Sequence, residues 1–203
     1  MKKIFIATLL LLTAIATMSA ANEADALIKK AAAAFCNKGV EVSYTLDMDG
    51  NSLSGKLSMD GQKFFIDAEE MLTWFDGKTQ WTMQVDDDYS EVYISEPTAD
   101  ELKSINPYLL LNHYEKGYTA SLGSKNKGLQ EVVLTAKDQA DIKAVTVWMK
   151  PDGYVDAMRV VLAQGQEMNI KVNSFRNGLS LSKSTFTIPS AKLKKAAEVV
   201  DMR

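Results

Sequence analysis

Val40-Glu-Val-Ser-Tyr-Thr-Leu-Asp-Met48 alternates apolar and polar residues without a break. Successive side chains of a strand point to opposite faces, so this alternation predicts a strand with one buried face. The turn residues Asp49-Gly50-Asn51 follow, and the alternation resumes from Leu53 to Met59. Two such strands joined by a short glycine-containing turn form an antiparallel hairpin. The hairpin predicts a sheet that turns one face towards an apolar interior.

Strand-like segments recur along most of the remaining chain and are separated by turn sequences such as Asp60-Gly61, Asp76-Gly77-Lys78 and Pro151-Asp152-Gly153. Glycine after aspartate favours tight hairpin turns, which indicates antiparallel pairing of neighbouring strands. The expected strands are Lys63–Ala68, Met71–Phe75, Thr79–Val85, Tyr89–Ser95, Tyr118–Leu122, Gln130–Ala136, Ala144–Lys150, Tyr154–Leu162 and Met168–Phe175, with Ser184–Ile188 as the last candidate.

Two segments favour helices instead. Apolar residues recur at helical spacing from Ala24 to Phe35, with acidic residues early and lysines later. This helix is expected to end at Asn37-Lys38-Gly39, where glycine supplies the cap. A second helix opens at Pro97 and is interrupted by Pro107, because proline cannot continue helical hydrogen bonding. The order of elements predicts an α+β, mainly β fold: an incomplete antiparallel β-barrel, or strongly curved sheet, with helices covering its concave side.

The first twenty residues have the pattern of a secretory signal peptide. Lys2 and Lys3 precede an apolar run from Ile4 to Met18, and the small residues Ser19-Ala20-Ala21 follow. The apolar run is shorter than the ~20 residues that a permanent membrane span needs. We therefore expect residues 1–20 to be removed by cleavage near Ala20 or Ala21. Residues 21–203 are expected to form a single exported domain.

The charge balance argues against several classes of partner. The formal net charge is −3, and it becomes −5 when Lys2 and Lys3 are removed. Nucleic-acid phosphates are bound by clustered basic residues, so an acidic chain without a basic patch is not expected to bind nucleic acid. The same argument disfavours adsorption to an anionic membrane. The single cysteine, Cys36, cannot form an internal disulfide, and we expect it to be a small buried residue.

Nothing in the sequence is typical of an enzyme or a metal site. His113 is the only histidine, so a nitrogen and sulfur zinc site cannot be built with Cys36 alone. Asp86-Asp87-Asp88 offers oxygen atoms that calcium prefers, but a solvated turn that protects a sheet edge is the simpler interpretation. The acidic pairs Glu69-Glu70 and Asp47 with Asp49 lack an aromatic sugar platform. We predict a protein that is not an enzyme and uses no cofactor or metal.

The strand faces are instead rich in methionine and large aromatic residues. Methionine is flexible and polarisable, so it suits a cavity that accepts apolar ligands of variable shape. An ordinary β-sheet core would have a similar composition. Composition alone therefore favours the ordinary core.

Several motifs, taken in order, resemble the LolA-type family of periplasmic outer-membrane lipoprotein carriers. Gly55-Lys-Leu57 precedes the aromatic Lys63-Phe-Phe65, and Phe75-Asp-Gly-Lys-Thr-Gln-Trp81 has the form of the family's next hairpin. The later segments Val145–Gly153 and Asn177-Gly178, with Phe186-Thr-Ile-Pro189 behind them, continue the resemblance. The family's closing segment has a second proline that this chain lacks. The order and spacing of the motifs cover roughly the whole chain after the signal peptide.

The resemblance implies a periplasmic protein whose hydrophobic cavity shields lipoprotein acyl chains between the inner and the outer membrane. It implies acylated lipoproteins, an inner-membrane release transporter and an outer-membrane acceptor as partners, with the protein itself a monomer. Pro107–Leu111 and the helix from Ala24 to Phe35 would cover the cavity. Many family members carry an arginine that ties the lid shut in the loop before the aromatic strand. Here that loop reads Asp60-Gly61-Gln62, and Lys63 is the nearest cation.

Strand parity, together with the lid segment, selects the residues expected to line the acyl-chain cavity. Two alternatives stay open: a regulatory domain of the same fold that senses lipids or lipoproteins in the envelope, and a scaffold protein with a filled core. The expected cavity residues are Tyr44, Leu46, Leu57, Met59, Phe65, Trp74, Trp81, Met83, Tyr108, Leu109, Leu110, Val147, Met149, Met158 and Val160.

Overall fold

The structure, a computed structural model, describes residues 20–21, 23–35, 39–69, 71–85, 89–106 and 108–203. The strands are β1 (Gly39–Met48), β2 (Asn51–Asp60), β3 (Lys63–Ala68), β4 (Met71–Phe75), β5 (Gln80–Val85), β6 (Ser90–Ser95), β7 (Tyr118–Asn126), β8 (Leu129–Ala136), β9 (Ile142–Met149), β10 (Val155–Leu162), β11 (Glu167–Leu179) and β12 (Glu198–Asp201). The helical elements are residues 23–35, α2 (Ala99–Ile105), α3 (Tyr108–Leu111), the short 3-10 helices η1 (Tyr114–Lys116) and η2 (Lys183–Phe186), and α4 (Ser190–Lys195).

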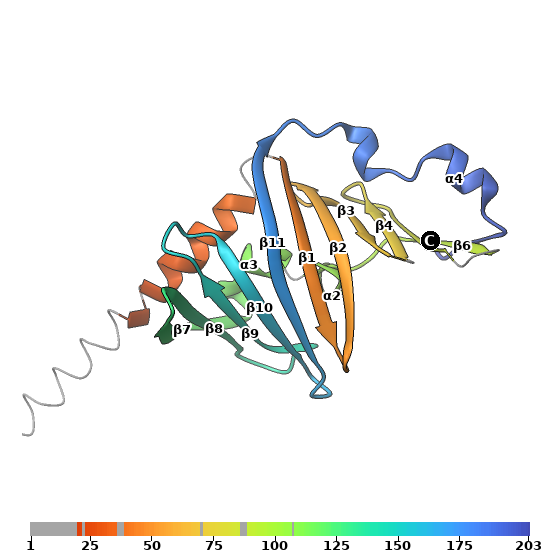
Figure 1. Cartoon of the computed structure of the whole chain (residues 1–203). Coiled ribbons are helices and arrows are strands. Elements are labelled where there is room, and N and C mark those ends of the chain that lie inside the picture. The colour runs from red at the N-terminus through yellow and green to blue at the C-terminus, as the bar shows by residue number, and fades with distance from the viewer. Residues whose placement is uncertain (1–19, 22, 36–38, 70, 86–88, 107) are drawn as a thin grey trace, which may run out of the picture.

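All the strands belong to one sheet of twelve, in the order β12-β6-β5-β4-β3-β2-β1-β11-β10-β9-β8-β7 (Figure 1). Neighbouring strands pair antiparallel except β12, which pairs parallel with β6. The long strands β1, β2 and β11 occupy the middle of the sheet. Because the edge strands β7 and β12 stay apart, the barrel is incomplete. The predicted α+β fold, with one curved and unclosed sheet, is confirmed.

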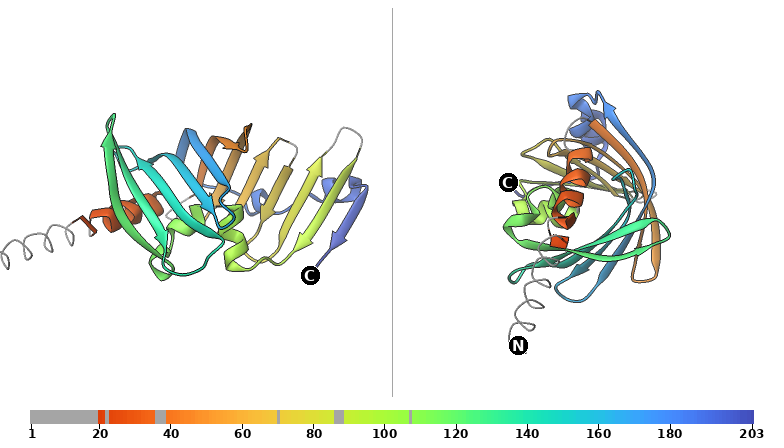
Figure 2. Two further views of the ribbon diagram at one scale, coloured as in Figure 1. Left: turned by 90° about the horizontal axis from the view of Figure 1, so that it is seen from below. Right: turned by 90° about the vertical axis from the view of Figure 1, so that its left-hand side faces the viewer.

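The concave face of the sheet holds the main hydrophobic core. The right-hand view of Figure 2 shows the sheet curling around helical residues 23–35, with α2 and α3 beside them. The helix buries its apolar stripe, which includes Ile28 and Phe35, as the helical spacing predicts. The Phe35 ring stacks on Tyr108 of α3 at 4.2 Å between centroids and meets Phe175 of β11 edge-on at 5.0 Å. One side chain therefore joins this helix, α3 and the sheet.

Polar contacts reinforce the same arrangement at the other end of the helix. The Tyr114 hydroxyl of η1 donates a hydrogen bond to the Asp25 carboxylate, and burial together with this contact raises the Tyr114 pKa. Lys29 Nζ lies 3.3 Å from Glu115 Oε1 in an exposed ion pair. Such surface pairs contribute about 0–1 kcal/mol, so the apolar stripe provides most of the attachment.

A second, smaller core lies on the opposite face of β3–β6. The strand register shows the separation directly: Phe64 pairs with Phe75 and joins the main core, whereas the next residue, Phe65, pairs with Trp74 in the second core. The segment from η2 to α4 covers this outer face and contributes Ile188, which is 6% exposed. Helices therefore cover both faces of the sheet, whereas the sequence predicted a cover on the concave face alone.

The C-terminal region also differs from the expected strand at Ser184–Ile188. Phe186 and Ile188 are both buried, which imitates the alternation of a strand, but residues 183–186 form the 3-10 helix η2. Pro189 then lacks the N–H that a strand would need, and α4 follows. The parallel strand β12 was not expected, because four residues are too few to show a pattern.

The end of the first helix was predicted at Asn37-Lys38-Gly39. Gly39 is instead the first residue of β1, and a Cβ built there would lie 2.5 Å from the Leu179 carbonyl oxygen. Glycine is thus required by close strand packing, since any side chain would collide with β11. The predictions for Cys36, Asp86-Asp87-Asp88 and Pro107 lie outside the described residues.

Replacing Phe35 with alanine should lower the free energy of unfolding by about 3–5 kcal/mol, because the ring is 2% exposed and packs on two elements. Urea denaturation followed by circular dichroism measures this change. Tyr89→Ala is the control, since that ring is 46% exposed and should cost less than about 1 kcal/mol. Equal losses in the two variants would contradict the packing described.

Candidate functional site

The concave face encloses one strongly apolar cavity between the central strands and the α2–α3 segment. Its volume is about 70 Å³. β1, β2, β3 and β11 form the floor, and the residues around the junction of α2 and α3 form the roof. The lining residues are Tyr44, Leu46, Leu57, Ile66, Ser104, Ile105, Asn106, Tyr108, Met168 and Ile170.

The floor of the cavity depends on a glycine. Gly55 lies directly opposite Tyr44 across the β1–β2 ladder. A Cβ built on Gly55 would approach the Tyr44 ring to 2.4 Å, so the ring lies flat against the strand because no side chain opposes it. Burial is the main cause of the raised Tyr44 pKa, with a smaller contribution from Asp67. The neutral tyrosine therefore presents an apolar ring surface to the cavity.

The roof begins with α2, a short helix that has no buried residue. Its N-terminus is well capped: Thr98 Oγ1 accepts from the Glu101 N–H at 3.3 Å, and the Glu101 carboxylate accepts from the Thr98 N–H at 2.7 Å. These hydrogen bonds lower the Glu101 pKa. The helix is thus stabilised mainly by its own caps. Half-buried Leu102 and Ile105 supply its contact with the main core.

Asn106, which is 2% exposed, forms the junction between α2 and α3. Its side-chain amide donates to Met59 Sδ at 3.6 Å, and its Oδ1 accepts from the Tyr108 N–H at 3.3 Å. Sulfur is a weak acceptor, so the bond to Met59 is a soft attachment of the roof to β2. Apart from its place beside a proline, nothing in the local sequence marks Asn106 as a cavity residue.

Tyr108 is buried at 4% exposure, but its hydroxyl has no hydrogen-bond partner among the described residues. Burial raises the Tyr108 pKa, and the nearby Tyr44 adds to the effect. A buried hydroxyl without a partner costs roughly 1–3 kcal/mol. The Tyr108 hydroxyl is therefore a donor without an acceptor among the described residues, next to the cavity.

In the family that the sequence resembles, a latch arginine occupies the loop that reads Asp60-Gly61-Gln62 here, the turn between β2 and β3. Gln62 does lie beside the roof, in a hollow of about 290 Å³ that it shares with Leu102, Leu109 and other residues. Within the part of the chain that the structure describes, no ion pair joins this turn to α2 or α3. The roof is held by apolar packing and by the Asn106 amide.

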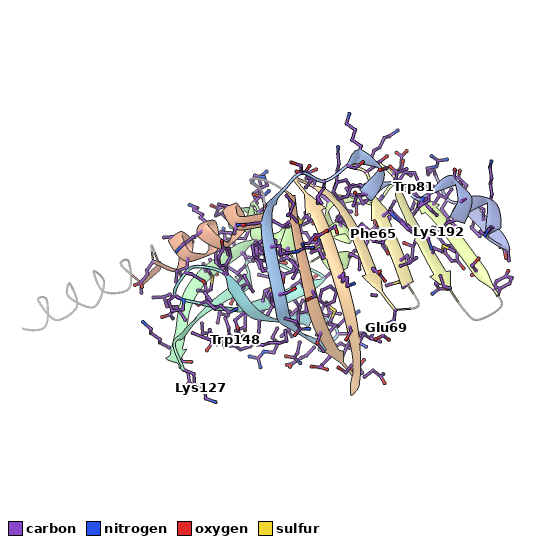
Figure 3. The ribbon with its side chains drawn as sticks, turned by 45° about the horizontal axis from the view of Figure 1, so that its top comes forward. Phe65, Glu69, Trp81, Lys127, Trp148 and Lys192 are labelled. Carbon is purple, nitrogen blue, oxygen red and sulfur yellow. The ribbon has the colours of Figure 1, made fainter. Side chains whose placement is uncertain are left out.

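An apolar rim continues from the cavity to the end of the sheet. It consists of Met48, Leu53 and Met71, which are 36%, 39% and 43% exposed and lie on the concave face by register. Residues 51–55 of β2 pair with β1 alone, so the β1–β2 hairpin extends beyond β3. Glu69 Oε1 accepts from the Ser54 N–H at 3.1 Å and closes the corner (Figure 3).

The structure brings together eleven of the fifteen residues predicted from the sequence. Four of them line the cavity: Tyr44, Leu46, Leu57 and Tyr108. The others belong to the surrounding main core, either buried or packed against it: Met59, Leu109, Leu110, Val147, Met149, Met158 and Val160.

The remaining four predicted residues, Phe65, Trp74, Trp81 and Met83, lie in the second core on the outer face. The prediction that they face the cavity is wrong. Two adjacent aromatics on β3 made parity ambiguous, and the pairing of Met59 with Phe64 selects Phe64 for the inner face. Parity counted from Phe64 would have found Ile66, and continuing the β11 alternation would have found Met168 and Ile170.

The other polar candidates do not assemble into a reactive site. Among the described residues, no group of three or more His, Cys, Asp and Glu side chains could hold a metal ion. His113 is exposed in a left-handed backbone conformation, and Glu69 bonds the backbone of β2. In the same part of the chain no helix is both long and apolar enough to cross a membrane.

A lidded apolar cavity on the concave face of an open sheet is the architecture of a protein that binds apolar ligands. The family model described as outer membrane lipoprotein carrier protein LolA matches residues 14–166. The chain therefore belongs to the LolA family. That description is of a carrier of lipoproteins and not of an enzyme.

Solved structures with a similar fold have low sequence identity to the chain. MucB in the Pseudomonas aeruginosa MucA/MucB complex shares 12% identity, with 83% of this chain and 62% of that chain covered and a TM-score of 0.44. A LolA superfamily protein from Nitrosomonas europaea shares 10%, with 81% and 97% covered and a TM-score of 0.44. Mycobacterium tuberculosis lipoprotein LppX shares 12%, with 79% and 99% covered and a TM-score of 0.44. The chain thus spans less than two thirds of MucB. Comparison with curated protein sequences finds no match.

Tyr108→Phe removes the buried hydroxyl that lacks a partner, so it should raise the free energy of unfolding by about 1 kcal/mol. For a chain of this size the melting temperature should rise by roughly 2–4 °C, measurable by differential scanning calorimetry. Tyr118→Phe is the matched control. Its hydroxyl donates to the Ile142 carbonyl at 2.9 Å, so its removal should lower stability. A loss of stability in Tyr108→Phe would contradict the account of the roof.

Proposed function

We propose that the protein is a periplasmic carrier that shields the acyl chains of lipoproteins in the concave cavity and transfers them from the inner to the outer membrane. The observation that carries this proposal is the apolar cavity roofed by a helix with no buried residue. Membership of the LolA family supports the same function.

Acyl chains need a shield because each CH₂ group exposed to water costs about 0.8 kcal/mol. Pockets that hold small ligands typically measure ~300–1,000 Å³. The cavity of about 70 Å³ is far smaller than an acyl chain requires. Binding must then displace the roof. α2 has no buried residue, so its displacement should cost less free energy than that of the other elements that cover the cavity.

The roof can shift without unfolding the sheet. α2 is attached through Leu102, Ile105 and the soft contact from Asn106 to Met59, whereas α3 buries Tyr108, Leu110 and Leu111. Movement of α2 about the junction would enlarge the cavity towards the rim. The Tyr108 hydroxyl would then be able to donate a hydrogen bond to the ester or amide carbonyl of an acyl group. This hydrogen bond would stabilise the ligand-bound state relative to the ligand-free state.

The proposed partners follow from the carrier role. They are acylated lipoproteins as cargo, an inner-membrane transporter that releases them and an outer-membrane acceptor that receives them. The protein would act as an exported monomer without a cofactor, after removal of residues 1–20.

Leu46→Trp should fill the cavity and weaken binding of a fluorescent fatty acid such as cis-parinaric acid by roughly tenfold or more. Leu46 is half-buried and lines the cavity beside the rim, so a larger ring is accommodated at the cost of ligand space. Fluorescence titration measures the dissociation constant.

The matched control is Asp47→Trp, which places the same ring one residue further along β1, on the exposed opposite face. Its affinity should stay close to that of the unchanged protein. If the two variants bind equally well, the acyl site lies elsewhere.

A transfer assay separates the carrier from its alternatives. The purified protein is incubated with inner-membrane vesicles that contain a labelled lipoprotein and a release transporter. A carrier brings the lipoprotein into the soluble fraction as a complex. A sensory domain would bind cis-parinaric acid but leave the lipoprotein in the membrane, and a scaffold with a filled core would do neither.

A further inference from the structure

Charge is distributed very unevenly along the chain. Residues 168–197 contain six basic residues and no acidic residue, although the whole protein has a net charge of −3. The net charge of the whole chain is an average that conceals this basic segment. The basic residues are Lys171, Arg176, Lys183, Lys192, Lys194 and Lys195.

Two of these six cations are neutralised within the sheet. Lys171 Nζ lies 2.5 Å from Asp156 Oδ2, and Arg176 pairs with Glu41. The salt bridges among the described residues include none of the remaining four lysines. Lys183 belongs to η2 and the other three to the last turn of α4, so all four lie in the segment that covers the outer face. Here they are called the lysine face: Lys183, Lys192, Lys194 and Lys195.

β12, which follows α4, and the residue after its partner strand β6 carry three acidic groups with partners of their own. Glu96 Oε1 lies 3.2 Å from Lys78 Nζ, and Asp201 Oδ2 lies 2.6 Å from Arg203 Nη2. Glu198 accepts a hydrogen bond from the Tyr89 hydroxyl at 3.1 Å. Glu96 and Asp201 are thus offset by cations, whereas Glu198 keeps its charge, and the four lysines still leave an excess of positive charge on this segment for an anionic partner.

Apolar groups accompany the lysine face. Phe65 and Trp81 are half-buried on the outer face, where Leu193 of α4 packs against the same core. Figure 3 shows Phe65, Trp81 and Lys192 towards one end of the sheet, beside α4. Val199, which follows α4, is 45% exposed. Lysines next to aromatic and apolar side chains are typical of surfaces that rest at the boundary between water and lipid headgroups.

From this combination we infer that the lysine face docks the protein on the surface of an anionic phospholipid bilayer. Exposed ammonium groups attract the headgroup phosphates, and the exposed apolar side chain of Val199 adds a contact with the interface. The attachment is electrostatic and reversible, because a few lysines without a lipid anchor give weak binding. It does not require an occupied cavity, so it stands independently of the proposed carrier role. It would hold the protein at membranes where apolar cargo is available.

The test is sedimentation of the full mature chain with vesicles of phosphatidylcholine that contain phosphatidylglycerol, compared with vesicles of phosphatidylcholine alone. Binding is expected to the anionic vesicles, and it should fall as salt is added, because salt screens exposed charges. Each neutralised lysine should lower the partition coefficient roughly fivefold, so Lys192→Gln, Lys194→Gln and Lys195→Gln together should lower it by about two orders of magnitude.

The matched control is Lys125→Gln, Lys127→Gln and Lys143→Gln, which changes the net charge equally through exposed residues towards the other end of the sheet (Figure 3 shows Lys127). This control should keep most of the binding. Urea denaturation should show the same stability for both triple variants, since the substituted residues lie outside both cores. Equal binding to neutral vesicles, or an equal loss in the control, would overturn the inference. So would a lack of vesicle binding, which would leave an acidic protein as the partner of this face.

Discussion

The stack of Phe35 on Tyr108 is the contact on which the cover of the concave face depends. Phe35 anchors the first helix to β11 through Phe175, and it fixes the start of α3 through Tyr108. α2 has no comparable anchor, since none of its residues is buried. The cover is thus divided into a rigid part, made of the first helix and α3, and a loosely held part, made of α2. This division permits a cavity that is closed when empty and able to open.

The two faces of the sheet differ in polarity and in the segments that cover them. On the concave face β5 is polar, with Gln80 Nε2 donating to Thr82 Oγ1 at 3.2 Å, and β4 places buried Thr73 between apolar Phe75 and Met71. The same strands turn Trp74 and Trp81 outwards, where the C-terminal segment covers them. The apolar cavity is lined by the central strands β1, β2, β3 and β11 together with the roof. The outer face at this end is occupied by packing and carries the lysine face on its surface.

Much of this could be derived from the sequence because it depends on local periodicity. The alternation from Val40 to Met59 identified the central hairpin, and the interruption at Pro107 separated the two pieces of the cover. The face of the sheet to which each side chain points was harder to predict. Phe64 and Phe65 are both aromatic, so the alternation of a strand cannot show which of them points inwards. The register with Met59 decides it, and that is a tertiary property. The route of the C-terminal segment and the parallel strand β12 likewise depend on long-range packing that no local pattern encodes.

We propose that an acyl ligand enters the concave cavity by displacing α2. Hydrogen–deuterium exchange of the mature chain, with and without a bound fatty acid, tests this most directly. We expect faster exchange at the amides of residues 99–105 when the ligand is bound, because displaced α2 loses its packing. Exchange in β1, β2 and β11 should be unchanged or slowed. Unchanged exchange in α2 at saturating ligand, or an effect confined to β4–β6, would contradict it.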